Sequence, residues 1–303
     1  MEIFKFNDLT TYYYMTGTSH ATQNRIVITA VGDTTCSDDA KRTFQNIVNE
    51  NPDVNLFLGD SSYSMDATCF IDLFKSFNGL KEKTIYSRGN HDDKEDESDT
   101  VKEQLEQYFG ITDWTVSQQQ KNVYIICMNS QDPDYDLKNR DQYNWVKSKL
   151  KEAGRLRDEE NKIDWIIVMV HKPLYTLKGQ HKPERKARHT YQPLFDKHQV
   201  DLVLQGHTHN MQRTLPIKYG ELDNEPIITT SGLDFSQDHG QIYIISGAGG
   251  RKIYKFGEPK NKWTPFAQDE EYGYHLLVVQ GKKIDIFAKS NDGDILEHVI
   301  VEK

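Results

Sequence analysis

Short apolar runs separated by helical segments organise the first two thirds of the chain. The runs are rich in β-branched residues and are bounded by Gly, Asn and Asp, which is typical of buried strands. They span residues 25–31, 54–58, 84–87, 123–128, 165–170 and 201–204. Segments with helical spacing lie between them, at 39–49, 100–109 and 140–150. Strands that alternate with helices predict a layered α/β domain.

The pattern changes after His209, where strands follow one another with tight turns and no long helix intervenes. The predicted strands span residues 226–229, 241–245, 275–279, 283–288 and 296–301. We expect them to add antiparallel strands to a second sheet. The chain shows no linker or repeat, so we predict one domain over 1–303. It would comprise an N-terminal arm (1–24), a core (25–213) and a strand extension (214–303).

Composition excludes several classes of protein. The chain contains no window of about 18 uninterrupted apolar residues, which is the length needed to span a membrane. Residues 1–24 also lack the apolar segment of a secretory signal. We therefore expect a soluble chain, although a signal removed beforehand would leave no trace. The formal charge of −9 disfavours extensive nonspecific binding to nucleic acid, because such binding depends on Lys and Arg contacts to the phosphates.

The three cysteines, Cys36, Cys69 and Cys127, form no Cys-x-x-Cys pair. Their odd number argues against a disulfide framework and favours a reducing compartment, so we expect a cytoplasmic protein. No partner base marks Cys36 or Cys69 as a nucleophile, and a buried free thiol is the simpler expectation for both.

Polar residues of metal-binding type follow five of the predicted strands. The residues are Asp33, Asp60, Asn90-His91-Asp92, His171, and His207 with His209. Taken singly, a Gly-Asp after a strand is more often an ordinary turn, and a lone histidine is more often part of a core. Ligands of open α/β sheets bind outside the carboxyl ends of the strands, so the whole set should converge. Glycine before a ligand would let the backbone turn sharply there.

The ordered motifs GD, GD, GNHD, VMVH and GHTH resemble the calcineurin-like metallophosphoesterase superfamily over residues 26–213. The resemblance implies a four-layer αββα sandwich, with two mixed β-sheets flanked by helices. In the commonest form of the family a metal-binding histidine stands two residues after the first aspartate, where this chain has Thr35. The purple acid phosphatase branch lacks that histidine and uses a tyrosine in Gly-Asp-x-x-Tyr, which residues 59–63 match. Aromatic packing is the alternative role for Tyr63.

The resemblance also implies two metal ions bridged by Asp60. The first would be held by Asp33, Asp60, Tyr63 and His209. The second would be held by Asp60, Asn90, His171 and His207. A phenolate favours Fe(III) at the first position, and divalent Fe, Zn or Mn would fill the other. Further similarities to the purple branch are Arg213 and the turn SGAGGR at 246–251.

Two histidines are expected to contact the substrate. By resemblance, His91 would bind the phosphate and protonate the leaving oxygen, with Asp92 orienting it. His181 would be a second such residue, with His189 as its rival. The alternatives are a structural histidine at 91 and polar loop residues at 181 and 189.

These features predict two-metal hydrolysis of phosphate esters, with a small phosphorylated substrate and a monoester as the first choice. A phosphodiesterase or nuclease on the same scaffold is the nearest alternative. In that case a basic cluster would bind the substrate. The cluster comprises Lys178, Lys182, Arg185, Lys186 and Arg188. An alternative of another class is a binding or scaffold protein with a decayed metal site, suggested by Thr35. The sequence leaves the physiological substrate and the oligomeric state open.

Overall fold

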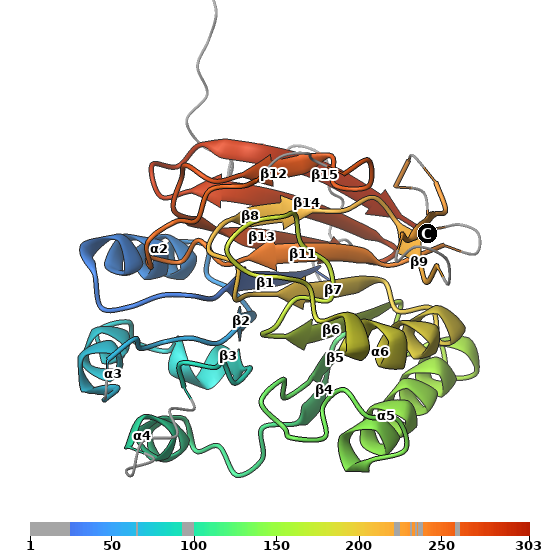
Figure 1. Cartoon of the computed structure of the whole chain (residues 1–303), viewed down its shortest axis with the longest axis horizontal. Helices are drawn as coiled ribbons and strands as arrows, with labels where there is room; N and C mark the ends of the chain where they lie inside the picture. Colours follow the sequence, from blue (N-terminus) through green and yellow to red (C-terminus); the bar gives the residue numbers. More distant parts are fainter. Residues whose placement is uncertain are drawn as a thin grey trace, which may run out of the picture.

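Two β-sheets stacked face to face form the centre of the molecule (Figure 1). The computed structural model describes residues 25–64, 66–92, 100–220, 225–230, 232–233, 235, 239–257 and 261–303. The predicted N-terminal arm, 1–24, lies outside the described residues.

The first sheet has six strands in the order β15-β14-β13-β1-β2-β3. Their bounds are β1 Arg25–Val31, β2 Val54–Phe57, β3 Thr84–Tyr86, β13 Gly273–Gln280, β14 Lys283–Ser290 and β15 Ile295–Glu302. Strands β1, β2 and β3 run parallel, whereas β13 pairs antiparallel with β1 through Ile28↔Leu277.

The second sheet has seven strands in the order β12-β8-β11-β7-β6-β5-β4. Their bounds are β4 Val116–Gln120, β5 Val123–Cys127, β6 Trp165–Val170, β7 Leu202–Gln205, β8 Met211–Arg213, β11 Ile242–Ser246 and β12 Phe266–Gln268. A small hairpin pairs β9 Ile217–Lys218 with β10 Ile227–Ile228.

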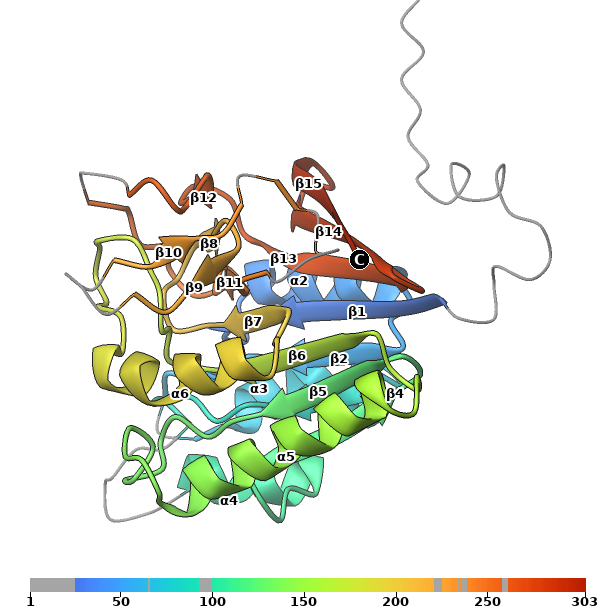
Figure 2. The ribbon, with the colours of Figure 1, turned by 90° about the vertical axis from the view of Figure 1, so that its right-hand side faces the viewer.

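Helices cover the outer faces of both sheets, as Figures 1 and 2 show. The helices are α2 Asp38–Asn49, α3 Thr68–Lys75, α4 Thr100–Phe109, α5 Asp141–Asp158 and α6 Arg185–Lys197, with a 3₁₀ turn at Lys81–Lys83. Helices α2, α3 and α4 pack on the first sheet, and α5 and α6 pack on the second.

Three apolar layers hold these elements together. The middle layer lies between the sheets and includes Ile28, Leu56, Ile167 and Leu204, all fully buried. Burial of such a side chain stabilises the fold by about 1.5–3 kcal/mol. The predicted four-layer αββα sandwich of two mixed sheets is therefore confirmed.

The C-terminal strands are arranged differently from the prediction. We expected residues 214–303 to extend the second sheet with antiparallel strands, but β13, β14 and β15 join the first sheet. Strand β11 joins the second sheet, where it pairs parallel with β7 and antiparallel with β8. An alternating pattern identifies a strand but does not specify its neighbour, which depends on contacts with distant segments.

A disulfide joins Cys36 to Cys69, with their Cα atoms 5.8 Å apart. The expectation of two free thiols was therefore wrong, and it also supplied the argument for a reducing compartment. Disulfides persist mainly in oxidising compartments. The cytoplasmic location remains a prediction without that support. Cys127 is buried and free, and burial raises the pKa of its thiol to about 12.

Candidate metal centre

The predicted ligands meet at one edge of the two sheets, where the parallel strands end. Asp33 follows β1, Asp60 follows β2 and Asn90 follows β3. From the second sheet, His171 follows β6, and His207 and His209 follow β7. Backbone hydrogen bonds tie the ligand loops together, for example from the Asp33 amide to the Gly59 carbonyl (3.0 Å) and from Gly206 to His171 (3.0 Å).

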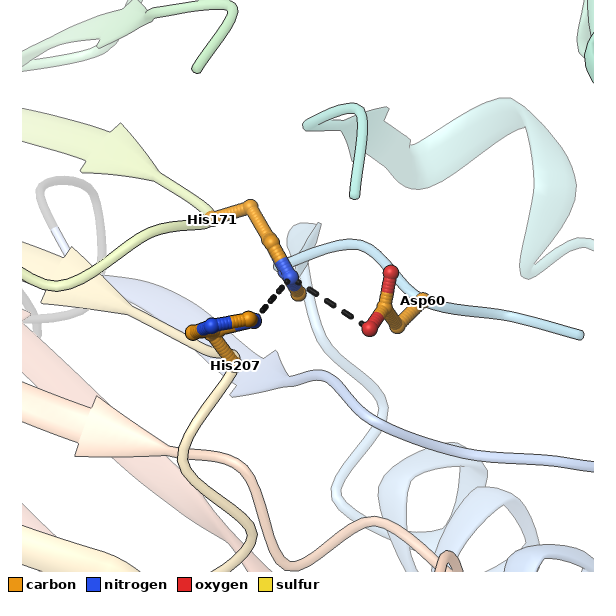
Figure 3. A group of neighbouring side chains, drawn as sticks. All are labelled: Asp60, His171 and His207. Atoms are coloured by element: carbon orange, nitrogen blue, oxygen red, sulfur yellow. Dashed lines mark hydrogen bonds and ion pairs between the residues drawn. The ribbon is translucent and has the colours of Figure 1, made fainter. Parts of the chain in front are cut away.

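One group of donor atoms surrounds Nε2 of His171. This nitrogen lies 3.4 Å from Oδ2 of Asp60, 3.1 Å from Oδ1 of Asn90 and 3.2 Å from Nδ1 of His207. Figure 3 shows His171 between Asp60 and His207, with all three side chains directed toward a common point. This grouping matches the ligand set expected for the second ion.

A second group of donor atoms surrounds the hydroxyl of Tyr63. The hydroxyl oxygen lies 2.8 Å from Nε2 of His209, 3.3 Å from Oδ1 of Asp33 and 3.4 Å from Oδ2 of Asp60. Asp60 therefore presents the same oxygen to both groups, as a bridging carboxylate would. The tyrosine of Gly-Asp-x-x-Tyr lies among the predicted ligands of the first ion.

Two backbone carbonyls set the orientation of the ligand histidines. Nδ1 of His171 lies 2.7 Å from the Leu58 carbonyl oxygen, and Nδ1 of His209 lies 2.8 Å from that of Lys252. In the neutral tautomer that suits these contacts, Nδ1–H donates to the carbonyl. This leaves the lone pair of Nε2 directed at the donor cluster, the arrangement usual for metal-binding histidines.

Strained backbone and close packing support the ligand positions. Asp33 (φ 57°), Asp60 (φ 57°) and His207 (φ 67°) all adopt the left-handed conformation that side chains rarely occupy. A side chain at Gly89 would collide with the Asp60 carboxylate, and one at Gly59 would come within 2.8 Å of Nδ1 of His171. The glycines before the ligands are thus required by close approach, as the sequence predicted.

The buried carboxylates give the centre the electrostatics of a cation site. Burial and the neighbouring Asp60 raise the pKa of Asp33, although the charge of His171 opposes them. Burial also raises the pKa of Tyr63, together with the charges of Asp33 and Asp60. For His171, burial lowers the pKa, but the charges of Asp60 and Asp33, together with hydrogen bonds to Asp60 and to the Leu58 carbonyl, raise it to about 9. Oδ2 of Asp33 has no hydrogen-bond partner within the described structure.

The residues present fit a pair of metal ions. Oxygen donors and imidazole nitrogens lie around two points, and the carboxylates could offset the charge of the cations. Bound cations would also remove the repulsion between the carboxylates and favour ionisation of the Tyr63 phenol.

The two predicted substrate-facing histidines lie over the donor groups. The ring centre of His91 is 4.2 Å from that of Tyr63, and the ring centre of His181 is 3.8 Å from that of His207. His189 belongs to α6, and its Nδ1 instead lies 2.6 Å from the hydroxyl oxygen of Tyr219. The geometry therefore favours His181 over its rival. Burial and His171 lower the pKa of His181.

Asp92 makes contacts that differ from those we expected. Its fully buried carboxylate accepts hydrogen bonds from the backbone amides of Asp60, Ser61 and Gly89, each at 2.9 Å. Its oxygen also accepts from the Ser61 hydroxyl. These contacts connect the loops after β2 and β3, so Asp92 shapes the backbone that carries Asp60.

No role was predicted from the sequence for two side chains that lie beside the centre, Tyr254 and Arg251. Tyr254 stacks on His209 with ring centres 4.0 Å apart, and Arg251 lies over Tyr63 with its guanidinium carbon 4.3 Å from the ring centre. The turn SGAGGR pointed to Arg251, but no motif marked Tyr254. Arg213 is paired with Glu297 through two hydrogen bonds of 2.8 and 2.6 Å, which gives it a structural role.

Comparison with known proteins gives consistent results. The family model for calcineurin-like phosphoesterase matches residues 26–211. The chain is 26% identical over 282 residues to purple acid phosphatase 21 of Arabidopsis thaliana, covering 85% of this chain and 58% of the relative. It is also 26% identical over 193 residues to the probable inactive purple acid phosphatase 1 of the same plant, covering 60% of this chain and 29% of that relative.

A solved purple acid phosphatase from yellow lupin (Lupinus luteus) seeds shares the fold. Its TM-score is 0.73 at 18% identity, over 93% of this chain and 54% of the lupin chain. The present chain thus spans between about a third and three fifths of the length of these relatives. Because the family model matches more than half of the sequence and contains every predicted ligand, the chain belongs to the calcineurin-like phosphoesterase family.

Proposed function

We propose that this chain hydrolyses phosphate monoesters at a centre of two metal ions. The observation that carries the proposal is the pair of donor groups that share Oδ2 of Asp60, one around Tyr63 and one around His171. Purple acid phosphatases among the relatives support the monoesterase over other activities of the family.

The chain offers a different set of donors to each ion. The first ion would be held by Asp33, Asp60, Tyr63 and His209. The second would be held by Asp60, Asn90, His171 and His207. The phenolate makes Fe(III) the best match for the first position, and a divalent Fe, Zn or Mn ion suits the second. When bound, the two ions would activate a water molecule and offset the negative charge of the phosphoryl group.

The protein's own groups bind the substrate and move the proton. His91 and His181 lie on the Tyr63 and His207 sides of the centre, where each can donate a hydrogen bond to phosphate oxygens. Either imidazolium can give its proton to the leaving oxygen as the ester bond breaks. Asp92 keeps the Asp60 backbone in the strained conformation that aims its carboxylate at both groups.

Metal analysis and two colorimetric substrates test the proposal. We expect about two metal ions per chain and faster turnover of p-nitrophenyl phosphate than of bis-p-nitrophenyl phosphate. Preference for the diester, with oligonucleotide binding that weakens steeply with salt, would favour the phosphodiesterase alternative. A chain with little metal and no turnover would instead be a binding protein, a role consistent with the relative named as probably inactive.

A further inference from the structure

A solvent-accessible cavity of about 250 Å³ adjoins the first donor group. Tyr63 forms the shared wall, because its ring lines the cavity while its hydroxyl lies among the predicted ligands. The Cys36–Cys69 disulfide closes another side. None of the described residues that line this space carries a carboxylate, although the neighbouring metal centre is rich in them.

Arg251 supplies the only positive charge among those lining residues. Its guanidinium carbon lies 4.3 Å from the ring centre of Tyr63, which is close enough for a cation–π contact. Within the described structure no carboxylate pairs with this guanidinium, so its hydrogen-bond donors face the cavity and solvent. An arginine with free donors is well suited to bind a phosphate or carboxylate group.

The backbone fixes Arg251 in this position. Its amide donates to the Asp33 carbonyl at 2.9 Å, and the Gly249 amide donates to that of Gly32 at 3.1 Å. Gly250 has φ 143°, and a side chain there would come within 2.6 Å of Cβ of Ala40. The turn is therefore pressed against β1 and α2, which places the base of the arginine side chain beside the metal ligands.

One hydroxyl of the cavity is also available as a donor. The hydroxyls of Ser61 and Ser62 donate to Asp92 and to the Asp66 carbonyl, and Ser64 likewise donates to Asp66. The Thr35 hydroxyl accepts from the Ser37 amide at 3.0 Å and keeps its own hydrogen for another acceptor. Thr35 thus offers a hydrogen-bond donor at the position where the commonest family form has a metal ligand.

We propose that Arg251 is a specificity-determining residue, which with Thr35 binds a second anionic group of the substrate in this cavity. The proposal rests on the proposed function and specifies its substrate class. The substrate would carry a phosphate or carboxylate close to the phosphoryl group that is hydrolysed. The metal centre binds the phosphoryl group, and the cavity beside Tyr63 binds the second anion.

Anion binding to Arg251 variants tests the proposal. Calorimetric titration of the purified protein with inorganic pyrophosphate and with orthophosphate compares a ligand that has a second anionic group with one that lacks it. We expect the unaltered chain to bind pyrophosphate more tightly. Arg251→Met should weaken pyrophosphate binding by about 10-fold and orthophosphate binding by less than about 3-fold, consistent with loss of a charge-assisted hydrogen bond.

Two further variants sharpen the comparison. Arg251→Lys keeps the charge and should retain part of the preference for pyrophosphate. Lys255→Met removes a positive charge from the same segment, but Lys255 pairs with Asp269 and Glu270 and does not line the cavity, so the preference should stay unchanged. If hydrolysis is measured, KM for pyrophosphate should rise in Arg251→Met while kcat stays within about 3-fold.

Several results would overturn the proposal. One is an unaltered chain that binds the two anions equally well, and another is an Arg251→Met variant that loses affinity for both to the same extent. The latter would mean that Arg251 only supports the packing of Tyr63. A chain that hydrolyses neither pyrophosphate nor phenyl phosphate would contradict the proposed function, whereas the titration would still decide the role of Arg251.

Discussion

The hydroxyl oxygen of Tyr63 lies 2.8 Å from Nε2 of His209. The other ring nitrogen, Nδ1, contacts the Lys252 carbonyl, so Nε2 remains free to bind a metal ion. A packing role alone would not require this contact between two donor atoms. Tyr63 also reaches Asp33 and Asp60, so a single ion could contact all four side chains. The relationship places the phenol among the donor atoms that we propose for the first ion.

The Tyr63→Phe variant should therefore lose any visible absorption band of the purified protein, because an Fe(III)–phenolate bond is coloured and a phenyl ring cannot form it. The measurement compares the visible absorption spectra of the unaltered protein and the variant. Tyr254→Phe is the matched control, since Tyr254 stacks on His209 but does not belong to either donor group. An unaltered band in Tyr63→Phe would remove Tyr63 from the ligand set.

Replacing His91 by Ala should lower kcat for phenyl phosphate by about 10²–10³, within the range usual for general acid catalysis. The loss should be smaller for p-nitrophenyl phosphate, because p-nitrophenolate leaves readily without a proton. Steady-state kinetics with both esters measures the difference. His189→Ala serves as the control, since His189 contacts Tyr219 rather than the centre. Equal losses with the two esters would contradict proton donation by His91.

Loss of the Cys36–Cys69 disulfide should lower the free energy of unfolding by about 4 kcal/mol. The bond closes a loop between cysteines separated by 33 positions, and the estimate follows from the lost entropy of loop closure. Urea unfolding of the protein with and without reductant is the measurement. In the double variant Cys36→Ser, Cys69→Ser, reductant should have no further effect. A reductant effect that persists in this variant would point to another cause.

His275 should make the fold sensitive to acid. Its side chain is fully enclosed between the sheets, and neither ring nitrogen has a hydrogen-bond partner in the described structure. Burial and the nearby Arg213 lower its pKa to about 3. Because the imidazole of the unfolded chain has a pKa of about 6.5, the unfolded state binds more protons between these values.

The contribution of His275 to stability is therefore complete above pH 6.5 and is lost as the pH falls toward 3. At pH 5 the loss should reach about 2 kcal/mol. His275→Phe should remove this part of the pH dependence, as measured by urea unfolding at pH 7 and pH 5. If the variant loses as much stability between these pH values as the unaltered chain, His275 is not responsible.

The amino-acid sequence alone determined which side chains leave the sheets at their carboxyl edge. Alternating and continuous apolar runs define strands locally, and the residue after each strand, such as Asp33 or His171, is then fixed by chain order. Parallel strands end at the same edge, so convergence of the predicted ligands followed from the sequence. Helices α3 and α6 were missed, because α3 has only 8 residues and α6 contains Pro193, which interrupts the usual helical pattern.

Only the tertiary structure decided relationships between residues that are distant in the chain. Spacing could not show that Cys36 and Cys69 come within bonding distance, that His181 rather than His189 faces the ligands, or that β13 joins β1. Each depends on how loops and strands pack after many residues of intervening chain. Local sequence fixes strand ends and backbone turns, whereas these pairings are selected by the free energy of the whole packed structure.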